Sequence, residues 1–289
     1  MKTILITGCS SGFGFLASKY LAEKGHQVIA TMRNVSSKNV EPATDLEQFG
    51  RTNGFKIRVL EMDVTSDESV KAAAAQIPTV DVLINNAGLG YGGAMEAFSP
   101  SAVLEQLDLN IVGNIRVAQA VLPGMRAQKS GLIIQLSSVA GRGAFPAFGV
   151  YHASKWGVEG LSEAMRYELA PFGIDVAIVE PGPFATNFFG NIVQAENEEV
   201  AHAYKHVKEF ADGFGESVMN LFADENAPTD PMIIVQIFED LINAKPGERP
   251  LRTIGGLDFG LQKLNDAIEP IRKELLEGMG IAHLDGVKK

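Results

Sequence analysis

The chain has 289 residues, of which 46% are hydrophobic and 21% charged, an ordinary composition for a soluble globular protein that can bury a sizeable core. Its 35 acidic and 25 basic residues leave a formal net charge of −10, which argues against nucleic acid as the main partner because phosphate binding requires a basic face. The single cysteine, Cys9, excludes a disulfide framework and a thiolate metal site, and no apolar run reaches the roughly 20 residues that span a bilayer. We therefore expect a cytoplasmic protein without membrane insertion.

A glycine-rich turn follows the first predicted strand. Residues 4–6 are wholly apolar, as in a buried parallel strand, and a helical pattern begins at Phe15. The intervening glycines permit a tight turn, and the helix N-terminus offers free N–H groups to a pyrophosphate. The spacing is GxxxGxG rather than the common GxGxxG, and an ordinary strand–turn–helix corner is the alternative interpretation. The residues expected to hold a dinucleotide are Thr7, Gly8, Ser10, Ser11, Gly12, Phe13 and Gly14.

The second predicted strand, residues 27–32, bears on the identity of this nucleotide. An NAD-binding chain usually places an acidic residue at the end of this strand to hold the ribose hydroxyls, whereas here Met32 is followed by Arg33. A guanidinium can pair with a 2′-phosphate and stack on adenine. NADP(H) is therefore favoured over NAD(H), with a solvent-exposed loop arginine as the alternative.

Two further strands end in polar or small residues. The third, over 56–62, ends at Asp63 and Val64, where the Asp63 carboxylate is expected to contact the adenine amino group, to begin the next helix, or both. The fourth, over 80–84, is followed by small and amide residues that would let a dinucleotide lie close to the backbone. An ordinary Asn/Gly turn is the alternative. The residues at this passage are Asn86, Ala87 and Gly88. Short helices are expected near 44–49 and over 66–77.

A long helix is predicted over 101–129, bent or interrupted at Pro123 and Gly124. Within it, Asn110 and Asn114 lie one turn apart among apolar neighbours, and a buried asparagine requires hydrogen-bond partners. Asn110 is therefore either a structural linker or a polar component of a site.

The fifth predicted strand, residues 131–136, places the hydroxyl of Ser138 at the carboxyl end of the sheet, where α/β proteins bind ligands. The next helix carries Tyr151 and Lys155, which are four residues apart and so share one helix face. A nearby ammonium lowers the pKa of a phenol, which can then exchange a proton with a substrate near neutral pH. A half-buried tyrosine beside a snorkelling lysine is the alternative.

The sixth predicted strand, residues 174–180, completes a pattern of strands alternating with helices, which predicts one doubly wound parallel sheet. A rigid proline–glycine turn follows it at the same edge of the sheet as the other polar strand ends. The residues of this turn that are expected to contact the nicotinamide end of the nucleotide are Pro181, Gly182, Phe184 and Thr186.

These motifs, taken in order, resemble the short-chain dehydrogenase/reductase family in its compact single-domain subgroup. Ser138 and Tyr151 stand 13 positions apart, as in that family, and no catalytic position departs from its pattern. The likeness covers roughly residues 1–190, with a looser resemblance to retinol and 17β-hydroxysteroid dehydrogenases. It implies an α/β, Rossmann-type doubly wound parallel sheet of about seven strands in a single domain with a variable C-terminal substrate lid.

The resemblance also implies roles for four residues. Tyr151 would be the general acid for carbonyl reduction or the base for alcohol oxidation, and Lys155 would lower the pKa of Tyr151 and bind the nicotinamide ribose. Ser138 would hold the substrate oxygen, and Asn110 would hold a water that links Lys155 to solvent. Hydride transfer would be the cofactor's chemistry, and no metal is needed.

The family motifs stop after Thr186. We expect one Rossmann-fold domain over 1–289, with a cofactor-binding and catalytic core at 1–186, a substrate-lid segment at 187–225, and C-terminal helices with the last strand at 226–289. Aromatic side chains in the lid segment either cover an apolar substrate or pack internally. The C-terminal elements expected are a helix over 228–243, a strand over 249–254 and a helix over 257–278 that is interrupted near Pro270.

Apolar side chains near the catalytic residues favour a hydrophobic, uncharged ketone, aldehyde or alcohol as substrate, since no Arg or Lys is placed for an anionic one. The expected substrate contacts are Ser138, Tyr151, Tyr91, Phe145, Phe148 and Phe188. Small and apolar residues after Lys155, from Trp156 to Met165, predict a homodimer or homotetramer, with packing inside the chain as the alternative. Two other functions remain open: an epimerase- or dehydratase-type relative, and a non-catalytic NADP-sensing regulator, whose expected mark is a damaged Ser/Tyr/Lys set.

Overall fold

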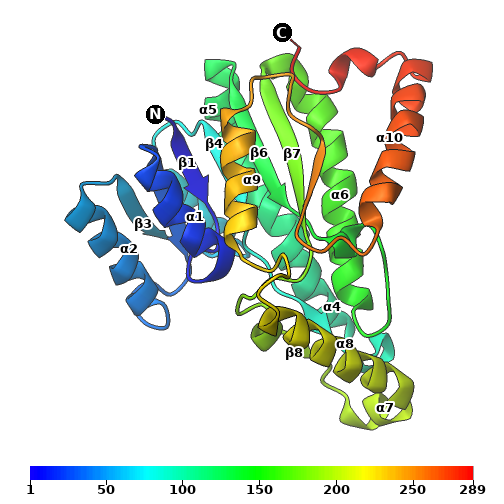
Figure 1. Ribbon diagram of the computed structural model, residues 1–289. Helices are drawn as coiled ribbons and strands as arrows, with labels where there is room; N and C mark the ends of the chain where they lie inside the picture. Colours follow the sequence, from blue (N-terminus) through cyan, green and yellow to red (C-terminus); the bar gives the residue numbers. More distant parts are fainter. Residues whose placement is uncertain (289) are drawn as a thin grey trace.

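The computed structural model describes residues 1–288 and is organised around a seven-stranded parallel sheet with helices on both faces (Figure 1). The strand order is β3-β2-β1-β4-β6-β7-β9. The chain thus starts near the middle of the sheet, builds one half outward and then crosses over to build the other, as in a Rossmann-type fold. The strands are β1 (Thr3–Ile6), β2 (Gln27–Met32), β3 (Ile57–Glu61), β4 (Val82–Asn85), β6 (Gly131–Leu136), β7 (Ile174–Pro181) and β9 (Arg252–Gly255). The predicted fold class is confirmed.

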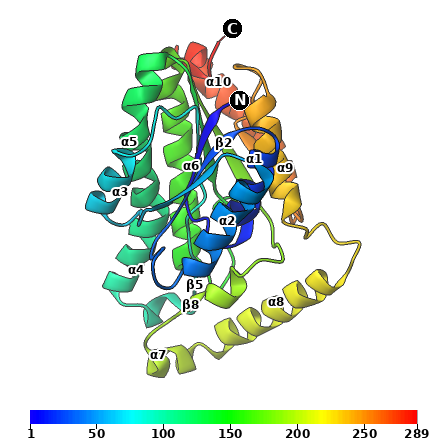
Figure 2. The same cartoon turned by 90° about the vertical axis from the view of Figure 1, so that its left-hand side faces the viewer.

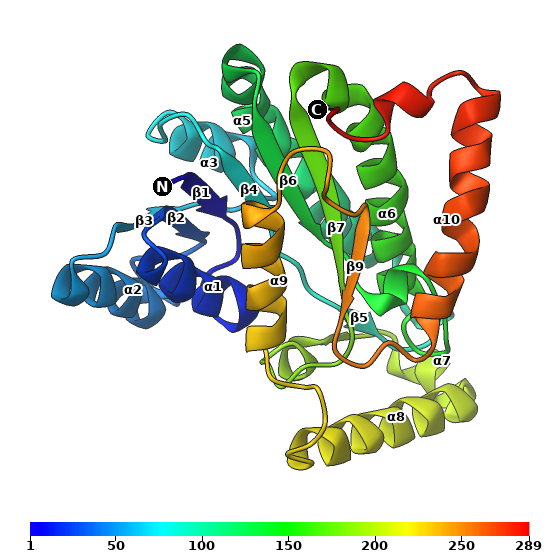
Figure 3. The same cartoon turned by 45° about the horizontal axis from the view of Figure 1, so that its top comes forward.

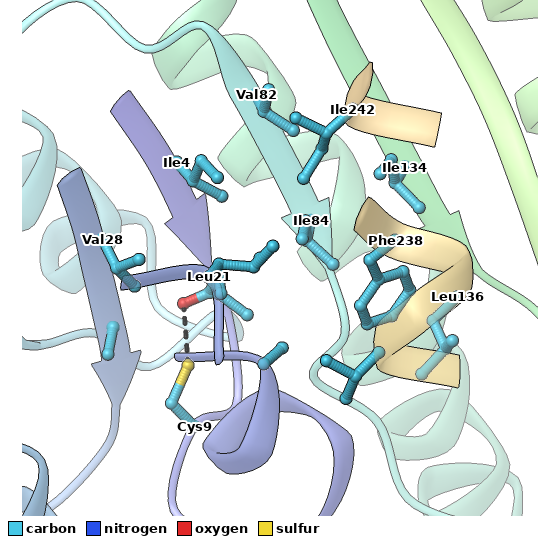
Figure 4. Close-up of a cluster of buried hydrophobic side chains, with 14 of the residues drawn as sticks. Ile4, Cys9, Leu21, Val28, Val82, Ile84, Ile134, Leu136, Phe238 and Ile242 are labelled. Atoms are coloured by element: carbon cyan, nitrogen blue, oxygen red, sulfur yellow. Dashed lines mark hydrogen bonds between the residues drawn. The ribbon is translucent and has the colours of Figure 1, made fainter. Parts of the chain in front are cut away.

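Successive side chains of the apolar strands face two different helical layers. Ile4 and Ile6 of β1 pack with helices α1 (Gly12–Glu23), α2 (Val40–Asn53) and α9 (Met232–Asn243). Figure 4 shows this cluster, in which Phe238 of α9 contacts the sheet beside Ile84 and Leu136. Leu5, between the two isoleucines, packs with the opposite layer of α3 (Asp67–Ala74), α5 (Gly113–Gln128) and α6 (Gly149–Leu169). Because both faces are covered, the central strands β1 and β4 are largely apolar.

Two prolines do not interrupt their helices as predicted. Pro123 lies inside α5 and Pro270 inside α10 (Leu261–Gly278), and both helices continue through them. The long helix instead changes geometry upstream, where α4 (Pro100–Leu107) passes through a π-helical turn over Asp108–Val112 before α5 begins. The extra residue in that turn redirects the side chain of Asn110, so the irregularity is at the polar residue rather than at the proline.

The segment after β7 forms a separate helical arm. It contains a short strand β8 (Val193–Gln194), which pairs in parallel with β5 (Tyr91–Gly92), followed by α7 (Glu198–Ala203) and α8 (Lys205–Ala223). Figure 2 shows α8 lying across the lower end of the molecule, beyond the carboxyl ends of the strands. The chain leaves and re-enters the core at one point, where the Ala185 N–H donates to the Thr229 carbonyl at 3.2 Å. The small β5–β8 sheet was not predicted, since two-residue strands carry no periodicity.

The last helix stands alongside α6 at the far edge of the molecule (Figure 3). Short 3₁₀ turns complete the chain at Met95–Ala97, Val139–Gly141, Ala170–Phe172, Phe189–Asn191 and Ala282–Leu284. Within residues 1–288, no helix is both long enough and apolar enough to cross a membrane.

Candidate active site

A cavity of about 590 Å³ opens at the carboxyl ends of the strands. One end lies against the turn after β1 and the residues that follow β2, and the other end lies under the helical arm. The predicted cofactor residues that line it are Gly8, Ser10, Ser11, Gly12, Phe13, Arg33, Asp63, Val64, Asn86, Ala87, Gly88, Tyr151, Lys155, Pro181, Gly182, Phe184 and Thr186. Residues that were scattered over 180 positions of sequence thus form one continuous wall, as expected at the switch point of a doubly wound sheet.

Thr7 and Gly14 were predicted to bind the nucleotide but do not line the cavity. The Thr7 hydroxyl accepts hydrogen bonds from the N–H groups of Asn86 and Ala87, each at 3.0 Å. A Cβ atom on Gly14 would lie 2.5 Å from Asn86 Nδ2 and 2.7 Å from the Gly8 carbonyl oxygen. Both residues therefore hold helix α1 and the loop after β4 against the turn, so their role is to shape the wall rather than to touch a ligand.

The turn after β1 has the properties that a pyrophosphate requires. Gly8 and Gly12 adopt φ of +71° and +58°, and a Cβ on Gly8 would lie 2.8 Å from Ala87 Cα. Ser11 begins α1 in an extended conformation without a side-chain cap, and no acidic residue occupies the first helical turn. The free N–H groups and the positive end of the helix dipole therefore face the cavity. These residues fit a dinucleotide cofactor.

Arg33 and Lys38 line the cavity beside the end of β2, and Arg33 is exposed to solvent. Its backbone carbonyl accepts a hydrogen bond from Asn39 Nδ2, which shapes the loop while leaving the guanidinium unconstrained. Asp63 lines the same end, but its Oδ1 accepts from both the N–H and the hydroxyl of Thr65, at 2.9 and 2.7 Å. The helix-entry interpretation of Asp63 is therefore correct in part: it forms the turn before α3, whose cap is Ser66.

Asn110 is buried between the loop after β4 and helix α6 and does not line the cavity. Its Nδ2 donates to the Leu89 carbonyl at 3.0 Å and to Ser154 Oγ at 2.9 Å, while its Oδ1 accepts from the Leu89 N–H at 3.2 Å. Its own carbonyl accepts from Asn114 Nδ2 at 2.9 Å. The side chain is thus the structural linker that the sequence analysis left as one alternative, joining the loop after β4 to helix α6.

Ser138 and Tyr151 meet in the cavity wall. The Ser138 hydroxyl donates to the Pro181 carbonyl at 3.3 Å and accepts from the Ala140 N–H at 3.1 Å, which fixes its position at the end of β6. It also bonds the Tyr151 phenol, which favours the phenolate, but burial outweighs that effect and raises the pKa of Tyr151 to about 12. Tyr151 therefore holds its proton at neutral pH.

Lys155 lies beside Tyr151, and in this arrangement the pKa of Tyr151 is shifted by burial and by the bond to Ser138. Its Nζ donates to the Leu136 carbonyl at 2.8 Å and lies 5.7 Å from the centroid of the Tyr151 ring. Burial instead acts on the ammonium and lowers the pKa of Lys155 to about 8, against the opposing charge of Glu159. Sequence spacing places the two residues on one face, but it does not reveal how far burial shifts each of them.

His152, next to Tyr151, has a structural role. Its Nδ1 lies 2.9 Å from the Ala140 carbonyl oxygen, and its Nε2 accepts from the Phe145 N–H at 3.1 Å. Because Nε2 is an acceptor, the neutral ring carries its proton on Nδ1 and donates to Ala140. Burial lowers the pKa of His152, which keeps that neutral form.

Aromatic side chains form the other end of the cavity. Phe145, Phe148 and Phe188 line it as predicted, and the Phe188 ring lies 5.4 Å from that of Tyr151. Tyr91 does not: it packs against Phe98 in a separate cluster, and its hydroxyl donates to Glu105 at 3.3 Å. The wall also contains apolar residues that were not predicted as site residues, because they come from loops or from distant elements. They are Leu89, Leu109, Phe189, Phe214 and Phe259.

The comparisons with known proteins agree with this geometry. A family model described as short chain dehydrogenase matches residues 2–197. The 3-ketodihydrosphingosine reductase of Bacteroides thetaiotaomicron is 39% identical over 80% of this chain and 79% of its own. Human retinol dehydrogenase 8 is 41% identical over 66% of this chain, and the alignment spans 62% of that longer relative, less than two thirds.

Solved structures extend the likeness to the whole chain. A short-chain dehydrogenase from Streptomyces avermitilis superposes with a TM-score of 0.76, at 31% identity over 98% of both chains. A gluconate 5-dehydrogenase from Burkholderia cenocepacia, solved with NADP and tartrate, has a TM-score of 0.60 at 32% identity over 65% of this chain and 73% of its own. Sequence motifs, sheet order and site geometry thus agree, and the chain belongs to the short-chain dehydrogenase family of oxidoreductases that act on CH–OH groups.

Proposed function

We propose that this protein is an NADP(H)-dependent oxidoreductase that interconverts a hydrophobic, uncharged ketone or aldehyde with its alcohol, with Tyr151 as acid and base. The observation that carries the proposal is the placement of the Tyr151 phenol in one cavity between Ser138 and the ring of Phe188, at the opposite end from the glycine-rich turn. A proton donor, an oxygen-orienting hydroxyl and an apolar wall are the groups that carbonyl reduction needs.

The bound nicotinamide supplies or accepts the hydride. Ser138, positioned by the Ala140 N–H, orients the substrate oxygen by turning its hydroxyl proton from the Pro181 carbonyl to that oxygen as negative charge develops. Tyr151, which is protonated at neutral pH, gives its proton to that oxygen, and the negative charge that develops there makes the transfer favourable. In the reverse direction Tyr151 accepts the alcohol proton, which requires the positive charge of Lys155 nearby.

The proposed preference for NADP(H) rests on the charges at the end of β2. Arg33 and Lys38 line this part of the cavity, and Met32 stands where a ribose-binding carboxylate would be expected. The related gluconate 5-dehydrogenase was solved with NADP, which supports the same preference. We assign the remaining nucleotide contacts to the cavity residues of the turns after β1, β3, β4 and β7.

The proposed hydrophobic substrate rests on the aromatic end of the cavity. Phe145, Phe148 and Phe188 surround the side of Tyr151 that faces the helical arm, and Phe214 of α8 closes over Phe145 at a ring distance of 5.2 Å. Relatives named for retinol, 3-ketodihydrosphingosine and 17β-hydroxysteroids support a substrate with a large hydrocarbon part. We therefore treat residues 187–225 as the substrate lid of a single domain.

We further propose that Asn110 supports a water-mediated proton path to Lys155 and that the protein assembles as a homodimer or homotetramer. The first is compatible with the backbone carbonyl of Asn110, which lies in the π-helical turn beside α6. The second is supported by Trp156, which is 50% exposed on α6, whereas Gly157 packs inside the chain against Ile111. Trp156 could therefore contact another subunit, whereas Gly157 is already covered by residues of the same chain.

The test is the oxidation of NADPH by a panel of carbonyl compounds, comparing wild type with Tyr151→Phe. The substitution removes the phenolic hydroxyl and keeps the ring that packs against Phe188, so the fold should persist. We expect kcat to fall by about 10²- to 10⁴-fold, the contribution of a positioned general acid. Equal activity of the two proteins would contradict the role of Tyr151, and the absence of turnover in wild type with every carbonyl would contradict the reaction.

A further inference from the structure

A cluster of buried charges lies directly behind Lys155. Glu159 follows Lys155 by one turn of α6, and the two side chains share a buried helix face. Both residues are almost inaccessible to solvent, at 3% and 7% exposed. Neither belongs to the hydrophobic clusters of the core, so a buried acid and a buried base occupy neighbouring positions next to the cavity.

Arginines on other elements hold the carboxylates of this cluster. Arg252 on β9 bonds Glu159 Oε2 at 2.8 Å and Glu163 Oε1 at 2.6 Å, and it approaches Glu180 Oε1 at 3.3 Å. Glu180, at the end of β7, also accepts from Asn265 Nδ2 of α10 at 2.6 Å. Arg142, after the 3₁₀ turn that follows β6, lies 4.0 Å from Glu180. The cluster therefore joins five separate parts of the fold.

The second oxygen of Glu159 faces the end of β6. Among the described residues no arginine binds Glu159 Oε1, and the nearby Ser137 hydroxyl acts to lower the pKa of Glu159. A Cβ on Gly141 would lie 3.2 Å from this oxygen and 2.7 Å from Ser137 Oγ, so both atoms border the same glycine. Ser137 follows Leu136, whose carbonyl accepts the hydrogen bond of Lys155. Glu159 Oε1 therefore lies on the side of Glu159 that borders the carboxyl end of β6, where the Leu136 carbonyl binds Lys155.

We propose that Glu159 is a positioning residue of this enzyme: its carboxylate keeps the buried ammonium of Lys155 charged and thereby sets the highest pH at which the reaction runs. This proposal rests on the proposed function for its kinetic consequence, but its electrostatic part stands without turnover. Glu159 acts through Lys155 and is not assigned any contact with substrate or cofactor.

The balance of charges around Lys155 explains why Glu159 is the residue that matters. Burial lowers the pKa of Lys155, and Glu159 is the charge that opposes this effect. Glu163 is the other acid of α6 bound to Arg252, but its side chain is 29% exposed and it lies a further turn away. The charge of Arg142 and Arg252 is directed to the carboxylates and would by itself repel the ammonium.

Glu159 and Glu180 share a proton in this arrangement. Burial raises the pKa of both carboxyl groups, and the neighbouring charge of Glu159 raises that of Glu180 further, to about 8. Two like charges in one buried site do not ionise together, so one carboxyl keeps a proton near neutral pH. The shorter bond of Arg252 to Glu159, 2.8 Å against 3.3 Å, places the negative charge on Glu159 and the proton on Glu180.

The experiment compares Glu159→Gln with the matched control Glu163→Gln. Both variants remove one carboxylate that Arg252 binds on the same helix, but only the first removes the charge next to Lys155. In wild type, kcat/KM for alcohol oxidation, the direction that requires the charge of Lys155, should fall above the pKa of Lys155. We expect Glu159→Gln to move that alkaline decline to lower pH by about one unit or more, and Glu163→Gln to leave it in place. Profiles of wild type and Glu159→Gln that coincide would overturn the proposal.

A direct titration separates this proposal from the proposed function. The protein labelled at its lysine side chains is titrated by NMR, with the Lys155 signal assigned from its loss in Lys155→Met. The pKa of Lys155 should be lower in Glu159→Gln than in wild type, whether or not any carbonyl is reduced. An unchanged Lys155 titration refutes the inference, whereas a shifted titration in a protein without turnover refutes only the proposed reaction.

Folding is controlled by a second substitution. Glu159→Asp keeps the charge but shortens the side chain, so it should restore most of the alkaline activity lost in Glu159→Gln if the two variants are equally stable by thermal unfolding. If Glu159→Gln does not fold, Glu159→Asp serves as the test variant, with a smaller downward shift of the Lys155 titration expected because the charge lies farther from Nζ. A Lys155 titration in Glu159→Asp identical to that of wild type would then count against the proposal.

Discussion

The sheet and the helical arm differ in how much of each element is buried. All eight residues of β7 are buried, whereas in the 19 residues of α8 the single buried residue is Val218. Apolar contacts on both faces therefore fix the position of the strands. The residues at the strand ends that line the cavity are fixed with them. The arm is held by fewer contacts, so it can differ among relatives while the chemistry at Tyr151 stays the same.

The largest expected effect is on stability and separates these two regions directly. Phe238 of α9 is fully buried against the sheet (Figure 4), and Phe238→Ala should lower the free energy of unfolding by about 3–5 kcal/mol. Met219 of α8 is 62% exposed, and Met219→Ala should change it by less than about 0.5 kcal/mol. Urea denaturation of the two variants checks the comparison, and similar losses in both would contradict it.

Glycine substitutions give a second comparison. In Gly14→Ala the added carbon would lie 2.7 Å from the Gly8 carbonyl oxygen, so helix α1 must move away from the turn. We expect a loss of about 1–3 kcal/mol in stability together with weaker NADPH binding. Gly213→Ala in α8 meets nothing within 4 Å and should be neutral or slightly stabilising. Thermal unfolding and nucleotide titration measure both; retention of wild-type nucleotide affinity in Gly14→Ala would argue against the turn as the binding site.

A single substitution at Arg33, in the cofactor-binding segment, should reverse the cofactor preference. Arg33→Asp replaces a cation with a carboxylate that suits ribose hydroxyls and repels a 2′-phosphate. We expect the ratio of kcat/KM for NADPH over NADH to fall by about 10-fold or more, with stability unchanged because Arg33 is exposed. Wild type that already prefers NADH would show the proposed cofactor preference to be wrong.

In the arm, the expected effect is on substrate selection. Phe214→Ala removes a ring that lines the cavity and contacts Phe145, so KM for an aryl or steroid ketone should rise by roughly 10-fold. A small sugar ketone, which we expect to be a poor substrate, should show no comparable change. The control is Phe222→Ala: Phe222 lies in α8 like Phe214 and contacts Phe189, but it does not line the cavity, so this substitution should leave KM nearly unchanged. Preference of wild type for the sugar ketone would contradict the hydrophobic substrate class.

A further expected effect is the pH dependence of stability that Glu180 contributes. Its pKa is raised from the ordinary value of 4.5 to about 8 by burial and by Glu159, so its contribution is complete below the lower value and is lost as pH rises through the higher one. Glu180→Gln mimics the protonated group and should lack this loss. Its urea midpoint relative to wild type should therefore increase between about pH 5 and pH 8. A constant difference would show that Glu180 is ionised throughout.

Local sequence patterns were sufficient to predict the sheet, the turn after β1 and the set Ser138, Tyr151 and Lys155. Each depends on a short stretch in which strand, turn and helix follow one another, so chain order implies position at the carboxyl edge. Tyr91 was misplaced because it follows the nucleotide loop closely in sequence but turns toward Phe98 on the other side of that loop. Phe259 was missed because it reaches the cavity from a distant part of the chain, after β9.

The helices are not interrupted at Pro123 and Pro270 as predicted. Pro123 lies in α5, whose packing against the sheet outweighs the lost hydrogen bond, and sequence patterns do not contain that packing. Pro270 lies in α10, which buries little but is anchored next to the proline by the ion pairs of Arg272 with Glu269 and Asp285. The pKa of Tyr151 depends on how completely the phenol is buried, which is decided by Phe188 and the arm rather than by its spacing from Lys155. Spacing predicted which groups meet but not the dielectric environment in which they meet.

The hydrogen bond between Ala185 and Thr229 has an evolutionary consequence. Because the chain departs from and returns to the sheet at neighbouring residues, everything between them can be lengthened, shortened or replaced while the strands keep their register. A descendant of this protein could thus acquire a new substrate by recombination at two junctions that touch, with its proton-transfer residues inherited unchanged.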